Sequence, residues 1–218
     1  MRGGALAEVI LATAIIATVG VISVDQAGKS RRAVDARNIG EYMAAFQSAA
    51  VSYAIDNNAA ILAAAADGTG AATACVGNYV NVSTFDTLNN ATKHTCAVDV
   101  SWLIFKGYLP ASFAKTNNLG QAPAAIYRRV YSGATPTANM ELVVLAASGI
   151  GATTYATSKS FNNIQDAFSA AKLLGTNMGV VPADANLTGC VWDASVATNR
   201  YACGTQGSWK VTLSDFIN

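Results

Sequence analysis

The side chains in this sequence best suited to metal binding or covalent chemistry are four cysteines and one histidine. Thiolates and imidazoles bind zinc, but structural zinc sites draw on closely spaced pairs of these ligands. The cysteines are Cys75, Cys96, Cys190 and Cys203, without a C-x-x-C pair, and His94 is the lone histidine. This spacing excludes an ordinary Cys/His zinc site and points to disulfide chemistry.

Four cysteines allow three disulfide pairings. We expect the nearest-neighbour pairing, Cys75–Cys96 and Cys190–Cys203, in which each short closed loop stabilises the fold by about 3 kcal/mol. The alternative is four buried free thiols. Because disulfides persist in oxidising compartments, the expectation depends on export of the chain.

Catalytic motifs are missing from the sequence: it has no G-x-S-x-G, no G-x-x-x-x-G-K-[ST] and no H-E-x-x-H. The glycine-rich "SGIGATT" beginning at Ser148 predicts a tight turn, because it lacks the third glycine and the acidic residue of a dinucleotide site. His94 lies in a polar stretch and is expected to be solvated. Arg128 and Arg129 are expected to form surface ion pairs. We therefore expect that the protein is not an enzyme and binds no metal ion or cofactor.

The composition narrows the class of protein further. Charged residues make up 12% of the 218 residues, about half the roughly 25% of typical soluble domains. The formal net charge is +1, which leaves no electrostatic footprint for nucleic acid. The abundance of Thr, Ser, Asn, Gly and Ala suits a secreted or surface-exposed bacterial protein. Core positions are expected for Trp102, Trp192 and Trp209, with sugar stacking as the alternative.

An apolar run, "ALAEVILATAIIATVGVISV", covers residues 5–24 and contains one carboxylate, Glu8. As a helix, its 20 residues would span ~30 Å, the thickness of a bilayer's hydrocarbon core. Basic residues flank the run at Arg2 before it and at Lys29, Arg31 and Arg32 after it. A secretory signal has a shorter apolar region and no carboxylate in it. Burying an ionised glutamate in a membrane costs several kcal/mol, so Glu8 in this run predicts a functional residue. The alternative is that Glu8 lies at the membrane interface of a simple anchor helix.

The helical pattern continues without a break after residue 24. Apolar residues recur every three or four positions at Ile39, Met43, Phe46, Ala50 and Tyr53, which makes one stripe on a helix. The sequence therefore predicts a single helix over residues 5–56, about 75 Å long. We expect residues 4–27 to form its hydrophobic, assembly or transmembrane half, and residues 28–66 to form an amphipathic half.

The stretch "RGGALAEVILATAIIATVGVISV" resembles the N-terminus of type IV pilins: a basic leader, a glycine, and a long apolar helix with glutamate at the fifth mature position. Aligning Glu8 with that glutamate makes residues 1–3 the leader and Gly4 the first mature residue. The leader is short, and Gly4 replaces the usual Phe, Met or Leu. The resemblance implies cleavage after Gly3 by a prepilin peptidase and methylation of the Gly4 amine. It also implies that Glu8 pairs with the amine of a neighbouring subunit and sets the register between helices.

Three glycines interrupt the predicted helix, at Gly20, Gly28 and Gly40, and each costs about 1 kcal/mol relative to alanine. In pilins, such positions let the helix bend or unwind when subunits pack. The alternative is close helix–helix approach through small residues.

The remaining residues, 67–218, predict an α+β head with an antiparallel sheet. The Ala-rich stretch after residue 57, ending at Gly68 and Gly70, is interpreted as a linker or loop. "VDVSWLIFKGYLP" predicts a short buried helix that stops at Gly107, and "SFNNIQDAFSAAKLLG" predicts a helix capped by Ser160. The β-rich runs "AAIYRRVYSG" and "NMELVVLAAS" predict an antiparallel pair, and "GSWKVTLSDF" predicts a final strand.

The head resembles the constant region of shufflon-type (PilV-like) minor pilins of conjugative type IVb pili. The resemblance rests on a Leu-rich helix, a Gly-Tyr-Leu-Pro turn and an Asn…Gly-Gln step, which here are Gly107, Tyr108, Leu109, Pro110, Asn117, Gly120 and Gln121. The stretch between Cys190 and Cys203 resembles the disulfide-bounded C-terminal region of pilins, which faces solvent and neighbouring subunits.

From these features we expect a structural subunit of a type IV (IVb) pilus, either a major or a minor tip pilin, used in adhesion or conjugation. Its partners would be copies of itself or other pilins, the prepilin peptidase and assembly machinery, and a recipient or host cell surface. It would reside in the bacterial inner membrane before assembly and in the extracellular pilus afterwards. The alternatives are a membrane-tethered periplasmic binding module that does not polymerise and, with least support, an anchored enzyme.

Overall fold

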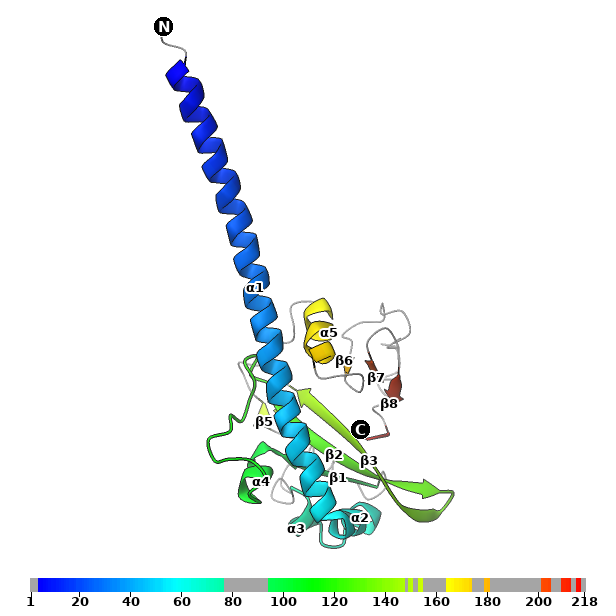
Figure 1. The fold of residues 1–218 in the computed structure, drawn as a ribbon. Coiled ribbons are helices and arrows are strands. Elements are labelled where there is room, and N and C mark those ends of the chain that lie inside the picture. The colour runs from blue at the N-terminus through cyan, green and yellow to red at the C-terminus, as the bar shows by residue number, and fades with distance from the viewer. Residues whose placement is uncertain are drawn as a thin grey trace.

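The computed structural model describes residues 4–76, 94–147, 149–150, 153–154, 164–173, 179–180, 201–204, 209–212 and 215–216, and for residues 4–29 it describes the helical backbone alone. These residues form an α+β protein with antiparallel sheets. A long helix, α1 (Gly4–Asp56), runs along one side of the head, and its N-terminal part extends beyond the head (Figure 1). No helix long and apolar enough to cross a membrane occurs in the part of the chain that the structure describes.

The single helix predicted for residues 5–56 is confirmed by α1, which has 53 residues. The predicted stripe is confirmed as well: Ile39, Phe46, Ala50 and Tyr53 are buried, and Met43 is half-buried. The prediction of one helical half reaching residue 66 was wrong, because α1 ends at Asp56. Just past this end, the Asn57 side chain and backbone N–H both donate to the Tyr53 carbonyl oxygen at 3.0 Å.

The stretch interpreted as a linker or loop is helical instead. It forms α2 (Asn58–Asp67) and α3 (Ala71–Ala74), and Ile61, Ala64 and Ala65 bury one side of α2. Gly68 ends α2 with a φ of +81°, in the left-handed region typical of a helix C-terminus.

The main sheet is antiparallel with strand order β1-β2-β3, formed by β1 (Thr95–Asp99), β2 (Ala122–Ser132) and β3 (Thr135–Ala147). The predicted antiparallel pair is therefore confirmed as β2 and β3. Their connection is short, because the ladder reaches Ser132 opposite Thr135 and leaves a turn of only Gly133 and Ala134. Gly133 has a φ of +61°, which a tight hairpin turn requires of one central residue.

Both faces of this sheet are covered. On one face, Val98, Ala125 and Tyr127 pack in the cluster that contains the buried residues of α1 and α2. On the other, Ala97 and Ile126 contact Phe216 near the C-terminus. This alternation follows from the two-residue period of a strand, and it makes the sheet the middle of three layers.

The short helix α4 (Val100–Phe105) confirms the predicted buried helix before Gly107. Asp99 caps it by accepting a hydrogen bond from the Trp102 backbone nitrogen at 2.7 Å. Strand β1, just before it, was missed, because its first residues were expected in a polar loop and Val98 onward in a helix. All five residues of β1 are buried, so no alternating pattern was present to reveal a strand.

The C-terminal part of the chain adds smaller elements. The predicted helix is confirmed as α5 (Ile164–Leu173), while its expected cap, Ser160, lies outside the described residues. The stretch predicted to form a tight turn contains β4 (Gly149–Ile150) and β5 (Thr153–Thr154), which pair antiparallel, while residues 151–152 between them lie outside the described residues. A third sheet combines β6 (Gly179–Val180), β7 (Tyr201–Gly204) and β8 (Lys210–Thr212), the last confirming the predicted final strand.

Candidate functional site

Helix α1 presents two very different sides over residues 30–56. One side packs on the head, and α1 contacts α2, α4, α5 and β2. The other side is exposed to solvent and carries small, short polar and charged residues. Three larger aliphatic side chains lie among them: Val34 is 56% exposed, Val51 40% and Ile55 71%. This exposed side, which we call the outer face of α1, is the candidate interaction surface of the protein.

One pair of opposite charges on the outer face is neutralised within the chain. The Arg37 Nε donates to Glu41 Oε1 at 2.7 Å, one helical turn away. The hydrogen bond to the Glu41 carboxylate raises the pKa of Arg37 above its usual value. Because the pair is exposed, it adds little to stability, but it leaves the outer face without an unpaired charge at this position.

The predicted assembly residues lie at the other end of α1. Gly4, Glu8, Gly20 and Gly28 belong to its helical backbone, and their side chains or surroundings lie outside what the structure describes. Gly3, the expected last residue of the leader, also lies outside the described residues.

Gly40 lies on the buried side of α1. Ala36 is buried one turn earlier on α1, Ala170 and Ala171 are buried on α5, and the two helices are in contact. Small residues at a helix crossing allow the backbones to approach closely. Small residues are therefore buried on both helices, and the two interpretations of Gly40 stay predictions.

Tyrosine hydroxyl groups attach the buried side of α1 to the head. Tyr127 of β2 donates its hydroxyl to the Ala50 carbonyl oxygen of α1 at 2.7 Å. Tyr53 of α1 donates to the Ala74 carbonyl oxygen at 2.7 Å and accepts from Trp102 Nε1 at 3.1 Å. Burial is the largest cause that raises the pKa of both tyrosines, so their hydroxyls stay protonated and act as donors.

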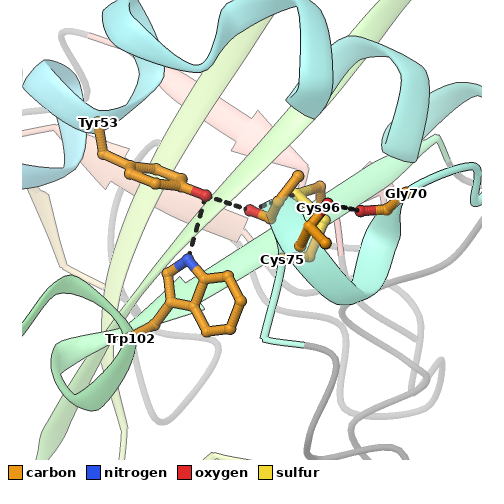
Figure 2. Close-up of a disulfide and its surroundings, with 7 residues drawn as sticks. Tyr53, Gly70, Cys75, Cys96 and Trp102 are labelled. Carbon is orange, nitrogen blue, oxygen red and sulfur yellow. Dashed lines mark hydrogen bonds between the residues drawn. A yellow bond between two sulfur atoms is a disulfide. The ribbon is translucent and has the colours of Figure 1, made fainter. Parts of the chain in front are cut away.

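The confirmed disulfide Cys75–Cys96 lies directly beside this network (Figure 2). Cys75 follows α3, Cys96 lies in β1, and their side chains are 1% and 0% exposed. Since Ala74 precedes Cys75 and accepts the Tyr53 bond, the disulfide holds the backbone to which α1 is attached. Cys203 in β7 is also disulfide-bonded, and its expected partner, Cys190, lies outside the described residues.

The segment that carries the minor-pilin resemblance packs along α1. Tyr108 donates its hydroxyl to Asp56 Oδ2 at 2.9 Å, at the end of the helix. Further back along α1, the Tyr42 ring stacks on Phe113 with centroids 5.0 Å apart. Asn117 is buried, and its Oδ1 accepts the backbone N–H groups of Leu119 and Gln121 at 2.9 and 3.0 Å. The Asn…Gly-Gln step therefore has a structural role, because it folds this segment into a compact loop.

His94 was expected to be solvated in a polar loop, but it is half-buried and contacts two other elements. Its ring stacks on Tyr131 with centroids 3.8 Å apart, and its Nδ1 lies 3.3 Å from the Ala66 carbonyl oxygen of α2. Nearby in β2, Arg129 donates to the carbonyl oxygens of Leu62 and Thr137.

Arg128 does form the expected surface pair, with Glu141 at 3.2 Å. Over the described residues, no group of three or more His, Cys, Asp or Glu side chains could hold a metal ion.

The predicted positions of the tryptophans are partly tested. Trp102 is 8% exposed and belongs to the core, and Trp209 is half-buried, while Trp192 lies outside the described residues. Tyr127 was missed as a supporting residue. A tyrosine inside an otherwise apolar strand was the available signal, because a buried hydroxyl needs a hydrogen-bond partner.

We expect Tyr127→Phe to lower the free energy of unfolding by about 1 kcal/mol, because it removes one buried hydrogen bond and keeps the ring. Urea denaturation followed by tryptophan fluorescence measures the change. The matched control is Tyr42→Phe, which removes an exposed bond to the Ala114 carbonyl oxygen and should change stability by less than about 0.5 kcal/mol. Equal losses in the two variants would contradict the assigned role of Tyr127.

No family model, no curated protein and no solved structure matches this chain.

Proposed function

We propose that this chain is a structural subunit of a type IV (IVb) pilus that polymerises through α1 into an extracellular filament. It would serve as a major or a minor tip pilin in adhesion or conjugation. The observation that carries the proposal is the 53-residue α1, which packs on the head along one side only, over residues 30–56, and continues beyond it into a sequence of membrane length. The outer face of α1 supports the proposal because its small residues suit close packing against other helices.

The proposal assigns partners to the two parts of the helix. The apolar residues 4–27 would lie in the inner membrane before assembly and in the core of the filament afterwards. Copies of this chain or other pilins would pack against them, and Glu8 would pair with the amine of a neighbour's Gly4. A prepilin peptidase and the pilus assembly machinery would act on the chain first. The head, cross-linked by its disulfides, would face solvent and a recipient or host cell surface.

Mass spectrometry of the N-terminus of the native protein tests this proposal. A pilin subunit should begin at a methylated Gly4, because the peptidase cleaves after Gly3 and methylates the new amine. A membrane-tethered periplasmic binding module, the second candidate, should keep residues 1–3 and carry no methyl group. An unprocessed N-terminus on protein taken from its native cells would contradict the pilin proposal.

A further inference from the structure

Strand β3 forms one edge of the main sheet. It pairs with β2 over most of its length, and no strand among the described residues pairs with its other side. A sheet edge presents a row of backbone N–H and C=O groups that can pair with a further strand. With 13 residues, β3 offers a long edge of this kind.

Over residues 140–146, the edge lacks the features by which proteins usually prevent such pairing, namely prolines, unpaired charges and bulges. Pro136 and the irregularity between Arg129 and Tyr131 both lie near the hairpin turn. Residues 140–146, "MELVVLA", contain one charged side chain, Glu141, which forms an ion pair with Arg128 at 3.2 Å. Two copies of this edge would therefore meet without bringing unpaired like charges together.

The burial of the two neighbouring strands differs in a way that indicates an incomplete edge. Ile126 and Tyr127 of β2 are 1% and 0% exposed. Their partners in the ladder, Val143 and Leu142, point to opposite faces of the sheet and are only half-buried. Both covering layers thus reach over β2 and leave β3 partly open on each face, so one more strand would complete the burial.

We propose that residues 140–146 of β3 pair antiparallel with the same residues of a second copy of this chain, joining the two main sheets across a twofold axis. A twofold axis perpendicular to a sheet keeps each residue on its own face, so one residue of β3 must lie opposite its own counterpart. The pairing is separate from the helix contacts of the proposed pilus and does not depend on them.

Single-cysteine cross-linking tests the pairing, because only a twofold contact places one position next to itself. Leu142, Val143, Val144 and Leu145 are each replaced by Cys in the full chain, purified in detergent micelles. No described cysteine of the native chain is a free thiol, so the introduced thiol is the one that reacts. All variants also carry Glu8→Ala, so that the outcome does not depend on filament assembly.

We expect oxidation to convert at least one of these variants to a covalent dimer about a hundredfold faster than Ala111→Cys, an exposed control position, because pairing raises the effective concentration of the thiols. Rates no higher than that of the control at all four positions would overturn the proposal. So would cross-linking in whole cells to a product whose mass is not twice that of the chain, since the edge would then bind another protein.

Sedimentation of the chain carrying Glu8→Ala and no introduced cysteine provides an independent measurement. It should show a dimer whose population rises with protein concentration. A monomer at every concentration, with the Cys75–Cys96 disulfide intact, would overturn the proposal even if cysteine replacement disturbs β3.

Discussion

The double variant Cys75→Ala, Cys96→Ala is expected to lose about 3 kcal/mol of unfolding free energy, a large share of the stability of a small domain. The disulfide closes a sequence separation of 21 residues, so its removal returns considerable conformational freedom to the unfolded chain. Both side chains are buried, which adds the loss of well-packed sulfur atoms. Urea denaturation without reductant, followed by tryptophan fluorescence, measures the difference.

The loss should extend to the attachment of α1, because Tyr53 bonds to the carbonyl oxygen of Ala74, next to Cys75. Hydrogen exchange should therefore quicken in α3 and around Tyr53 before it does so in β2. The control is Thr73→Ala, which removes an exposed hydroxyl from α3 and should change stability by less than about 0.5 kcal/mol. A double variant as stable as the native chain would show that the fold does not depend on this disulfide.

The sequence predicted the elements that have a clear hydrophobic period. The stripe from Ile39 to Tyr53 repeats at helical spacing, and it was sufficient to predict α1 and its buried side. The two β-rich runs were recognised from their branched and aromatic residues, and the Cys75–Cys96 pairing from the shortness of its loop. These elements and this disulfide could be predicted because each depends on the spacing of residues that lie close together in the sequence.

The elements that were missed depend on contacts between distant residues. Strand β1 is buried on both faces and shows no alternation, and α2 is an alanine-rich helix whose stability comes from burying Ile61 against the core. His94 has polar neighbours in sequence, yet Tyr131 and Ala66 enclose it from other elements. No local pattern encodes such partners, so tertiary packing overrode the local interpretation.

Replacing Glu8 with Ala is expected to leave the chain in the inner membrane but to remove nearly all filaments. Under the proposed function, the Glu8 carboxylate is buried opposite the Gly4 amine of a neighbouring subunit. Removing one partner of a buried ion pair costs about 3 kcal/mol or more, equivalent to a roughly hundredfold weaker contact at each subunit junction. Electron microscopy of sheared filaments, together with the amount of chain in the membrane fraction, measures both outcomes.

Glu41→Ala is the matched control on the same helix. Glu41 is exposed and pairs with Arg37 of its own chain at 2.7 Å, so its removal should leave the number of filaments within about a factor of two. The two glutamates differ in where their partner lies, in a second molecule for Glu8 and one turn away for Glu41. Normal filaments from Glu8→Ala would therefore contradict an intermolecular ion pair as the basis of assembly. An equal loss of filaments from both variants would show that any substitution of a glutamate in α1 impairs assembly, so that Glu8 has no special role.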